Sequence, residues 1–115
     1  MKDTDPQSFL PLPAPFFQIL VALAAGDAHG YAIMQDVEGR TAGKLRLSPG
    51  TLYGSIKRML ELGLILEAPR KAGEDERRRC YRLTALGKRT ARAEAERMAD
   101  TLRYARSSGL APHEL

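Results

Sequence analysis

The sequence has few of the residues that build disulfides, metal sites and catalytic centres. It contains one cysteine, two histidines and no tryptophan, which excludes an intramolecular disulfide and leaves no cluster of metal ligands. Cys80 is interpreted as a small apolar strand residue, and His29 has no partner nearby that would make it a base or a ligand. No nucleophile with a base and no phosphate-cradling glycine loop is present. The sequence therefore argues against an enzyme, a metal site or a cofactor.

Long hydrophobic runs are also missing. The longest apolar stretch, residues 16–25, is interrupted by Gln18 and is too short to cross a bilayer. Residues 1–15 contain four prolines and no hydrophobic core of a signal peptide. We therefore expect a cytoplasmic protein with a flexible, extended arm over residues 1–14. The large apolar residues of this arm dock either on the body of the protein or on a second subunit: Phe9, Leu10 and Leu12.

The composition is that of one basic globular domain. Of 115 residues, 43% are hydrophobic and 28% are charged, which suits a folded chain too short for a second, catalytic domain. The formal net charge of +4 favours an anionic partner. Cations gather in residues 70–82, where the acidic residues 74–76 partly offset them.

Residues 48–63 are predicted to form a helix with both ends written into the sequence. Ser48 suits the N-cap, Pro49 the first helical position and Gly63 the left-handed residue that ends a helix. Apolar residues recur at helical spacing and must be buried: Leu52, Ile56, Met59 and Leu60. The opposite face combines hydroxyls, cations and small residues, which suit a polyanion: Thr51, Gly54, Ser55 and Arg58, with Tyr53 and Lys57 at its edges. On a lone helix, the alternative is a polar face that only meets water.

The residues after this helix favour the interpretation that its polar face binds a polyanion. Residues 64–68 form a short apolar run, residues 69–76 have turn composition, and residues 77–83 alternate like a strand. A helix followed by a hairpin with a basic return strand is typical of a winged helix-turn-helix. In that fold the recognition helix enters the major groove of DNA and the hairpin lies along the backbone.

Two more helices are predicted ahead of the recognition helix. One begins at Pro15 and ends before Gly26, and the second runs from about residue 29 to residue 39. Free backbone amides at the amino end of the second helix favour an anion, such as a phosphate, beside His29 and Tyr31. Residues 45–47 are a candidate third strand for the sheet of the predicted hairpin, which is called the wing.

The last helix is predicted from the N-cap Thr84 to about Arg106, although Gly87 departs from the capping-box pattern. Apolar residues in it recur in alternating steps of four and three, as in a coiled-coil seam: Ala91, Ala95, Met98, Leu102 and Ala105. Packing on the same domain is the alternative. We favour homodimerisation, because the first three helices already have the wing sheet to cover. Residues 107–115 are expected to be a frayed tail.

Three segments together resemble the PadR family of transcriptional regulators, specifically its shorter members with a single carboxy-terminal helix. They are residues 29–33 (HGYAI), residues 50–65 and residues 78–84 followed by Gly87. The resemblance covers roughly residues 16–102, and the order and spacing of the segments make it specific.

The resemblance implies a dimeric winged-helix repressor with Tyr31, Thr51 and Tyr53 near the DNA backbone. It also implies a response to small, often aromatic ligands, although no residue set fixes a pocket for them. Two features depart from the family. Cys80 replaces the first of a usual aromatic pair, and the wing tip is more acidic than expected.

The predicted fold class is mainly α with a small β-hairpin. A winged helix-turn-helix occupies residues 15–83 and a dimerisation helix residues 84–106. We expect a sequence-specific transcriptional regulator, a homodimeric repressor of a pseudopalindromic operator in double-stranded DNA, released by a small-molecule effector. The alternative is a winged-helix module that binds protein and not DNA.

The residues expected to bind DNA fall into two groups. Those that read or grip the groove are Thr51, Ser55, Lys57 and Arg58, with Ser48 at the start of their helix. Those that hold phosphates are Tyr31, Tyr53, Arg70, Lys71 and Arg78. The walls expected for an aromatic or hydrophobic effector are Phe16, Phe17, Leu20, Met98 and Leu102, unless these residues only pack on one another.

Overall fold

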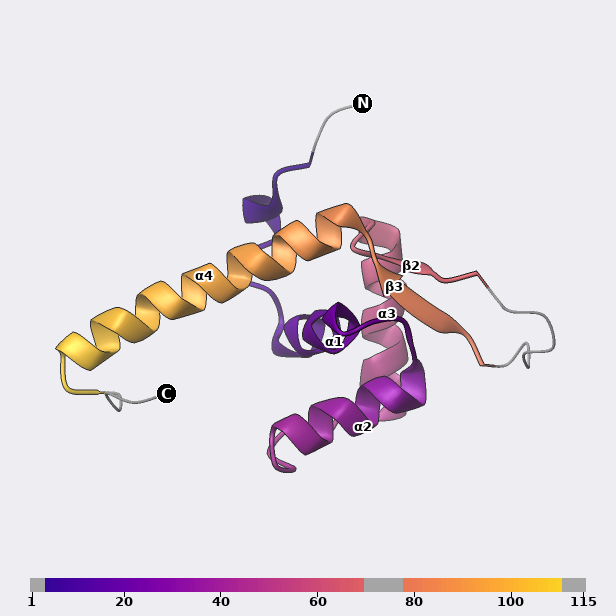
Figure 1. Ribbon diagram of the computed structural model, residues 1–115, viewed down its shortest axis with the longest axis horizontal. Coiled ribbons are helices and arrows are strands. Elements are labelled where there is room, and N and C mark those ends of the chain that lie inside the picture. Colours follow the sequence, from indigo (N-terminus) through magenta and orange to yellow (C-terminus); the bar gives the residue numbers. More distant parts are fainter. Residues whose placement is uncertain (1–3, 70–77, 111–115) are drawn as a thin grey trace.

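The computed structural model describes residues 4–69 and 78–110, and in these residues the chain is mainly helical (Figure 1). The described residues form four α-helices and a small three-stranded antiparallel sheet at one edge of the molecule (Figure 1), which confirms the predicted fold class. In chain order the elements are η1 (Pro6–Phe9), α1 (Ala14–Ala24), β1 (Ala28–His29), α2 (Gly30–Arg40), α3 (Pro49–Leu62), β2 (Ile65–Glu67), β3 (Cys80–Leu83) and α4 (Ala85–Ser107). None of these helices is long and apolar enough to pass through a bilayer.

Helix α3 has the two ends that its sequence predicts. The Ser48 hydroxyl accepts the Thr51 amide at 3.1 Å, and Pro49 is the first helical residue. Gly63 ends the helix in the left-handed region with φ +77°, where a side chain would be strained. Three of the four predicted apolar positions are buried, but Leu60 lies at the edge of the stripe and is 37% exposed.

The prediction of a strand over residues 45–47 is wrong. The third strand is β1, and the sheet has the order β1-β3-β2. Thr41 accounts for the difference, because its hydroxyl accepts the Leu45 amide at 3.1 Å and donates to the Val37 carbonyl at 2.8 Å. This capping ties the connection to the end of α2, and Leu47 turns into the core.

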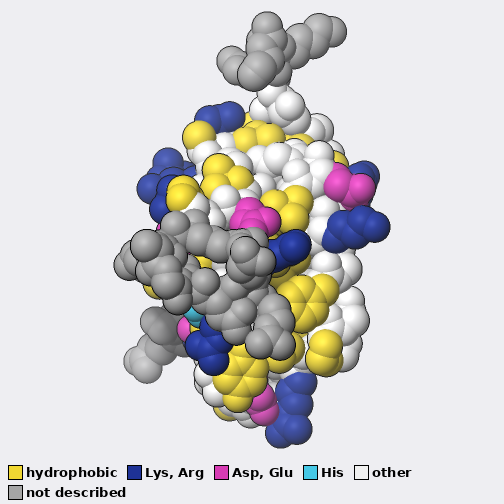
Figure 2. All heavy atoms as spheres, turned by 90° about the vertical axis from the view of Figure 1, so that its right-hand side faces the viewer, with side chains coloured by type: hydrophobic (Ala, Val, Ile, Leu, Met, Phe, Trp, Pro, Cys, Tyr) yellow, Lys and Arg dark blue, Asp and Glu magenta, His cyan; other side chains and the backbone are white. Residues whose placement is uncertain are grey.

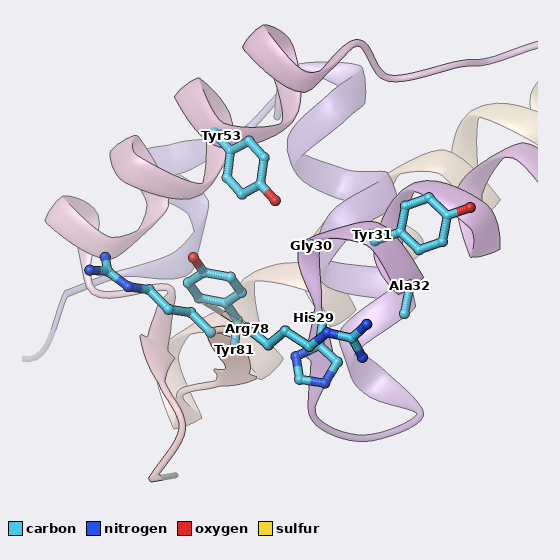
Figure 3. A pocket seen from close by; sticks show the side chains of 8 residues that line it. His29, Gly30, Tyr31, Ala32, Tyr53, Arg78 and Tyr81 are labelled. Carbon is cyan, nitrogen blue, oxygen red and sulfur yellow. The ribbon is translucent and has the colours of Figure 1, made fainter. Parts of the chain in front are cut away.

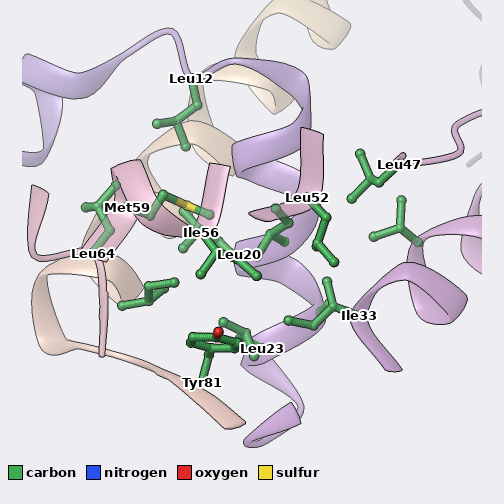
Figure 4. Close-up of a cluster of buried hydrophobic side chains, with 14 residues drawn as sticks. Leu12, Leu20, Leu23, Ile33, Leu47, Leu52, Ile56, Met59, Leu64 and Tyr81 are labelled. Atoms are coloured by element: carbon green, nitrogen blue, oxygen red, sulfur yellow. The ribbon is translucent and has the colours of Figure 1, made fainter. Parts of the chain in front are cut away.

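The hydrophobic core lies between α1, α2, α3 and the sheet (Figure 4). Burial of an aliphatic side chain of this size contributes roughly 1.5–3 kcal/mol each. The core therefore holds α3 against the body through its apolar stripe and leaves its polar face outside. The largest apolar side chains that are fully buried are Ile19, Leu20, Ile33, Val37, Leu52, Met59, Leu64 and Ile65.

The amino-terminal arm is not a flexible, extended segment from residue 4 onward. Asp5 caps the short helix η1 by accepting the Gln7 amide at 2.9 Å. Leu12 is 9% exposed and joins the core. Its amide donates to the Glu94 carboxylate at 2.7 Å, so the arm docks on its own body and connects it to α4.

Glu94 is the buried acceptor of this connection. Its side chain is fully buried and also accepts a hydrogen bond from Arg97. The Arg97 hydrogen bond is the largest cause that moves the pKa of Glu94 below its ordinary value; the Leu12 amide lowers the pKa further, and burial opposes both. The folded state therefore favours the charged carboxylate.

We expect Glu94→Gln to remove a pH-dependent part of the stability. A depressed folded pKa stabilises the fold above the unfolded pKa, and this contribution is lost as the pH falls through the folded value. At pH 7 the variant should be less stable by on the order of 1 kcal/mol, because it loses a charged acceptor. At acid pH the two proteins should converge in urea denaturation. Exposed Glu96→Gln is the control, and equal pH profiles for all three proteins would contradict the assignment.

Helix α4 begins as predicted and ends with more order than predicted. The Thr84 hydroxyl accepts the Gly87 amide at 2.9 Å and donates to the Gly63 carbonyl at 2.6 Å. At the other end, Gly109 has φ +75° and the Leu110 amide donates to the Ala105 carbonyl at 2.8 Å. Residues 107–110 therefore form an ordered helix end, while 111–115 lie outside the described residues.

Candidate nucleic-acid interface

The outer face of α3 is the first component of the candidate site. Thr51, Lys57 and Arg58 are exposed on it, as predicted. Arg58 lies 3.7 Å from Glu61, and both side chains are more than half exposed. Such surface pairs contribute about 0–1 kcal/mol, so a phosphate or a base edge can compete for the guanidinium.

Two serines expected on this face have other roles. Ser55 is 8% exposed, so its placement in the groove is wrong: the helix turns it toward the body, beside the apolar stripe. The Ser48 hydroxyl is exposed but caps α3, and it donates to the Thr51 hydroxyl at 3.1 Å. The Thr51 oxygen keeps a free lone pair toward solvent.

The amino end of α2 is the second component. His29 occupies the N-cap without a side-chain hydrogen bond to the first turn, so the amides of that turn are available to an anion. Tyr31 follows with 65% of its surface exposed, and its hydroxyl accepts from Gln35 at 3.1 Å. This end of α2 is positioned by β1, which pairs with β3.

The third component comes from the wing, the hairpin that contains β2 and β3, where Arg78 and Arg79 lie just before β3. Arg78 is exposed, and Arg79 approaches Glu67 only to 3.8 Å. Arg82 has a structural role instead, because it binds both carboxylate oxygens of Asp27, at 2.9 and 2.7 Å. That hydrogen bond raises the pKa of Arg82. The predicted phosphate contacts Arg70 and Lys71 lie outside the described residues.

These three components meet at a pocket of about 560 Å³. Figure 3 shows Tyr53 reaching from α3 toward the amino end of α2, beside Tyr81 of β3 and Arg78, which lies just before that strand. Glycine at position 30 permits the close approach, since a Cβ there would lie 2.7 Å from the Tyr53 hydroxyl. Figure 2 views the side of the molecule that carries the strands and shows apolar side chains with cations around them. The side chains that line the pocket include His29, Tyr31, Tyr53, Arg78, Arg79 and Tyr81.

Sequence reasoning missed Arg79 and Tyr81 as members of this pocket. It placed His29 at the amino end of α2 but did not bring it together with Tyr81. They come together because β1 pairs with β3, with Ala28 opposite Tyr81 and His29 opposite Cys80. The Cys80 sulfur lies 3.1 Å from Nδ1 of His29. No local sequence pattern signals this pairing, since β1 has two residues and lies far from β3 along the chain.

The residues predicted to form an effector pocket between α1 and α4 do not line a common pocket in the single chain. Leu20 is fully buried in the core, and Phe16 and Phe17 pack against it. Met98 and Leu102 instead line an open hollow of about 360 Å³ whose walls all come from α4. The proposed walls therefore belong to two separate surroundings.

The predicted seam on α4 is largely open in the single chain. Ala91 packs against the chain's own core, so this position serves intramolecular packing. Met98 is 41% exposed, and Leu102 and Ala105 line the open hollow with it. Ala95 is also exposed.

A helix pair with a β-hairpin beside its second helix defines a winged helix-turn-helix, the fold of many DNA-binding regulators. The family model described as the transcriptional regulator PadR-like family matches residues 19–93. The chain therefore belongs to the PadR-like family of transcriptional regulators, as the three sequence segments predicted. Members of this family are regulators and not enzymes.

Solved structures share the fold of this chain, and a curated protein resembles it in sequence. A transcriptional regulator from Clostridium thermocellum is 26% identical, with a TM-score of 0.68 over 81% of this chain and 87% of that one. A PadR family transcription regulator from Clostridium difficile shares the fold at 23% identity, with a TM-score of 0.69 over 83% of this chain and 97% of that one. An uncharacterized 37.1 kDa protein in a transposon of Streptomyces fradiae is 40% identical over 81 residues, or 70% of this chain; the match spans 22% of that relative.

Proposed function

We propose that this DNA-binding regulator is a cytoplasmic homodimeric repressor that places α3 in the major groove of a pseudopalindromic operator. One observation carries the proposal. The exposed cations of α3 continue the face on which Tyr53 meets the amino end of α2 and the wing. Lys57 follows Tyr53 by one helical turn, and residues four apart lie on the same side of a helix. Groove-reading and phosphate-holding groups therefore face one way.

Different residues are suited to base contacts and to phosphate contacts. Thr51, Lys57 and Arg58 are suited to base edges and the groove wall, because they project from the exposed face of the recognition helix. Tyr31, Tyr53 and Arg78 surround the free amides of α2, which suit a backbone phosphate. Arg70 and Lys71 would extend the phosphate contacts along the wing.

Dimerisation supplies the second half-site. The open part of the α4 seam presents Met98 and Leu102 in an apolar hollow, and pairing with a second α4 would cover it. Two recognition helices serve two half-sites when they lie about 34 Å apart, one turn of DNA. An effector that binds an arrangement with a different separation would release the operator.

We expect Arg78→Ala and Arg58→Ala to weaken DNA binding in different ways. Loss of a phosphate contact at Arg78 should weaken binding to all sequences alike and reduce the slope of log affinity against log salt by about one. Loss of a base contact at Arg58 should cost about 1–3 kcal/mol and relax preference at one base pair. The operator is first recovered from genomic fragments bound by the purified protein, and affinity is then measured by fluorescence anisotropy.

The control is Arg103→Ala, an exposed arginine near the far end of α4, which should leave the affinity unchanged. Uniform losses for Arg58→Ala across all operators would make Arg58 a backbone contact. Binding without a steep dependence on salt would favour the protein-binding module over the DNA-binding regulator.

A further inference from the structure

The pocket between α2, α3 and β3 has a deep apolar side that a DNA backbone phosphate does not need. Tyr31 and Tyr53 form walls that remain well exposed. Tyr81 lies at the inner end, where its ring packs in the hydrophobic core and its hydroxyl points toward the pocket (Figures 3 and 4). A volume of about 560 Å³ is within the range of small-molecule sites, roughly 300–1,000 Å³.

The Tyr81 hydroxyl is the feature that points to a ligand. The residue is 5% exposed, and within residues 4–69 and 78–110 its hydroxyl makes no hydrogen bond. The hydroxyl oxygen is not among the buried atoms that lack a partner; it opens into the pocket, where it can donate a hydrogen bond to a ligand. Burial, with a smaller contribution from the charge of Glu67, raises the pKa of Tyr81. The phenol is therefore a neutral hydrogen-bond donor at physiological pH.

The outer end of the same pocket is built for a strongly charged anion. The first-turn amides of α2 have no side-chain cap, and the Arg78 guanidinium makes no ion pair with the described residues. His29 and Arg79 line the pocket beside them. Several donors that converge on one position favour a phosphate group, which carries more charge and more acceptor oxygens than a carboxylate.

We propose that this pocket binds an aromatic phosphate monoester, of which a nucleoside monophosphate is the natural example. The aromatic group lies against Tyr31 and Tyr53, and a ring acceptor such as a purine nitrogen accepts a hydrogen bond from the Tyr81 hydroxyl. The phosphate binds Arg78 and the amides of α2. Because the phosphate takes the place assigned to the DNA backbone, the ligand and the operator exclude each other. This last step rests on the proposed DNA-binding function.

Binding is tested first without DNA, by isothermal titration calorimetry of the full chain. The probes are AMP and 2-naphthyl phosphate, compared with adenosine, inorganic phosphate and 2-naphthoate. Tyr81→Phe should weaken AMP binding roughly tenfold, since it removes one hydrogen bond to the base and keeps the ring. The affinity of 2-naphthyl phosphate, whose ring has no acceptor, should stay nearly unchanged in this variant. Tyr104→Phe, at a tyrosine 77% exposed on α4, should change affinity less than twofold.

A second variant narrows the pocket without touching the core. In Gly30→Ala the new methyl meets the end of the Tyr53 side chain, which can move, so folding should be kept and ligand affinity should fall. Equal affinity of 2-naphthyl phosphate and 2-naphthoate would overturn the assignment to phosphate esters. Absence of AMP and 2-naphthyl phosphate binding, or unchanged AMP affinity in both pocket variants, would overturn the site.

The regulatory step is tested separately by operator competition. The apparent dissociation constant for DNA should rise linearly with the concentration of AMP or 2-naphthyl phosphate. A ligand that binds without changing the DNA affinity would overturn the exclusion. A protein that binds the ligand but no DNA at any salt concentration would overturn the proposed function and leave the pocket standing.

Discussion

Gly87→Ala is expected to lower the free energy of unfolding by about 3 kcal/mol or more. A Cβ at position 87 would lie 1.9 Å from the Leu64 carbonyl oxygen and 2.9 Å from its carbonyl carbon. Overpacking against side chains typically costs about 1–3 kcal/mol, and here the obstacle is backbone. That carbonyl also accepts a hydrogen bond from the Thr84 amide at 3.2 Å, so relief of the clash would pull the start of α4 away from residue 64, which directly precedes β2.

The measurement is urea denaturation followed by circular dichroism, with Gly39→Ala as the matched control. Gly39 lies in α2 and a Cβ there would meet nothing within 4 Å, so the same added methyl should stabilise the helix by up to about 1 kcal/mol. Opposite signs are therefore expected from one chemical change. Similar midpoints for the two variants would mean that α4 does not lie against residue 64 as described.

The ends of α3 were predictable because their signals are local. Ser48, Pro49 and Gly63 each act through backbone geometry within one helical turn, and each has its predicted role. The N-cap Thr84 was predictable for the same reason. Gly87 shows the limit of such reasoning. In the sequence it is a departure from the capping-box pattern, whereas in the structure it allows α4 to pack closely against the backbone of Leu64.

The pocket and the third strand were not predictable from local pattern. A strand of two residues has no periodicity, and β1 exists because β3 supplies its hydrogen-bond partners. The position of Tyr81 therefore depends on contacts between segments far apart along the chain. Ser55 was misplaced for a related reason, because the width of the buried stripe on α3 depends on what packs against it.

The arm illustrates a tertiary contact that overrides composition. Four prolines correctly exclude a long α-helix, but they do not prevent the short helix η1 or the burial of Leu12. The contact that fixes the arm is the hydrogen bond from Leu12 to Glu94, whose residues are 82 positions apart. No local sequence pattern around Leu12 or Glu94 indicates that these two residues are in contact.

Leu102→Glu should convert the proposed dimer to monomers and weaken operator binding by at least a hundredfold. In the dimer this side chain would lie in the paired hollow with Met98 and Ala105. Desolvation of a carboxylate there costs several kcal/mol, and alanines in the seam leave little apolar area to offset that cost. A monomer presents one recognition helix and loses the second half-site.

Sedimentation equilibrium gives the oligomeric state, and Ser107→Glu is the control. Residue 107 is exposed and lies about 140° around α4 from residue 102 in an ideal helix, so its added carboxylate faces away from the seam. The control should remain a dimer with unchanged operator affinity. If both variants stay dimeric, the subunits associate through another surface. If both dissociate, added negative charge on α4 disrupts the dimer from either side of the helix, and the apolar hollow is not what holds the two chains together.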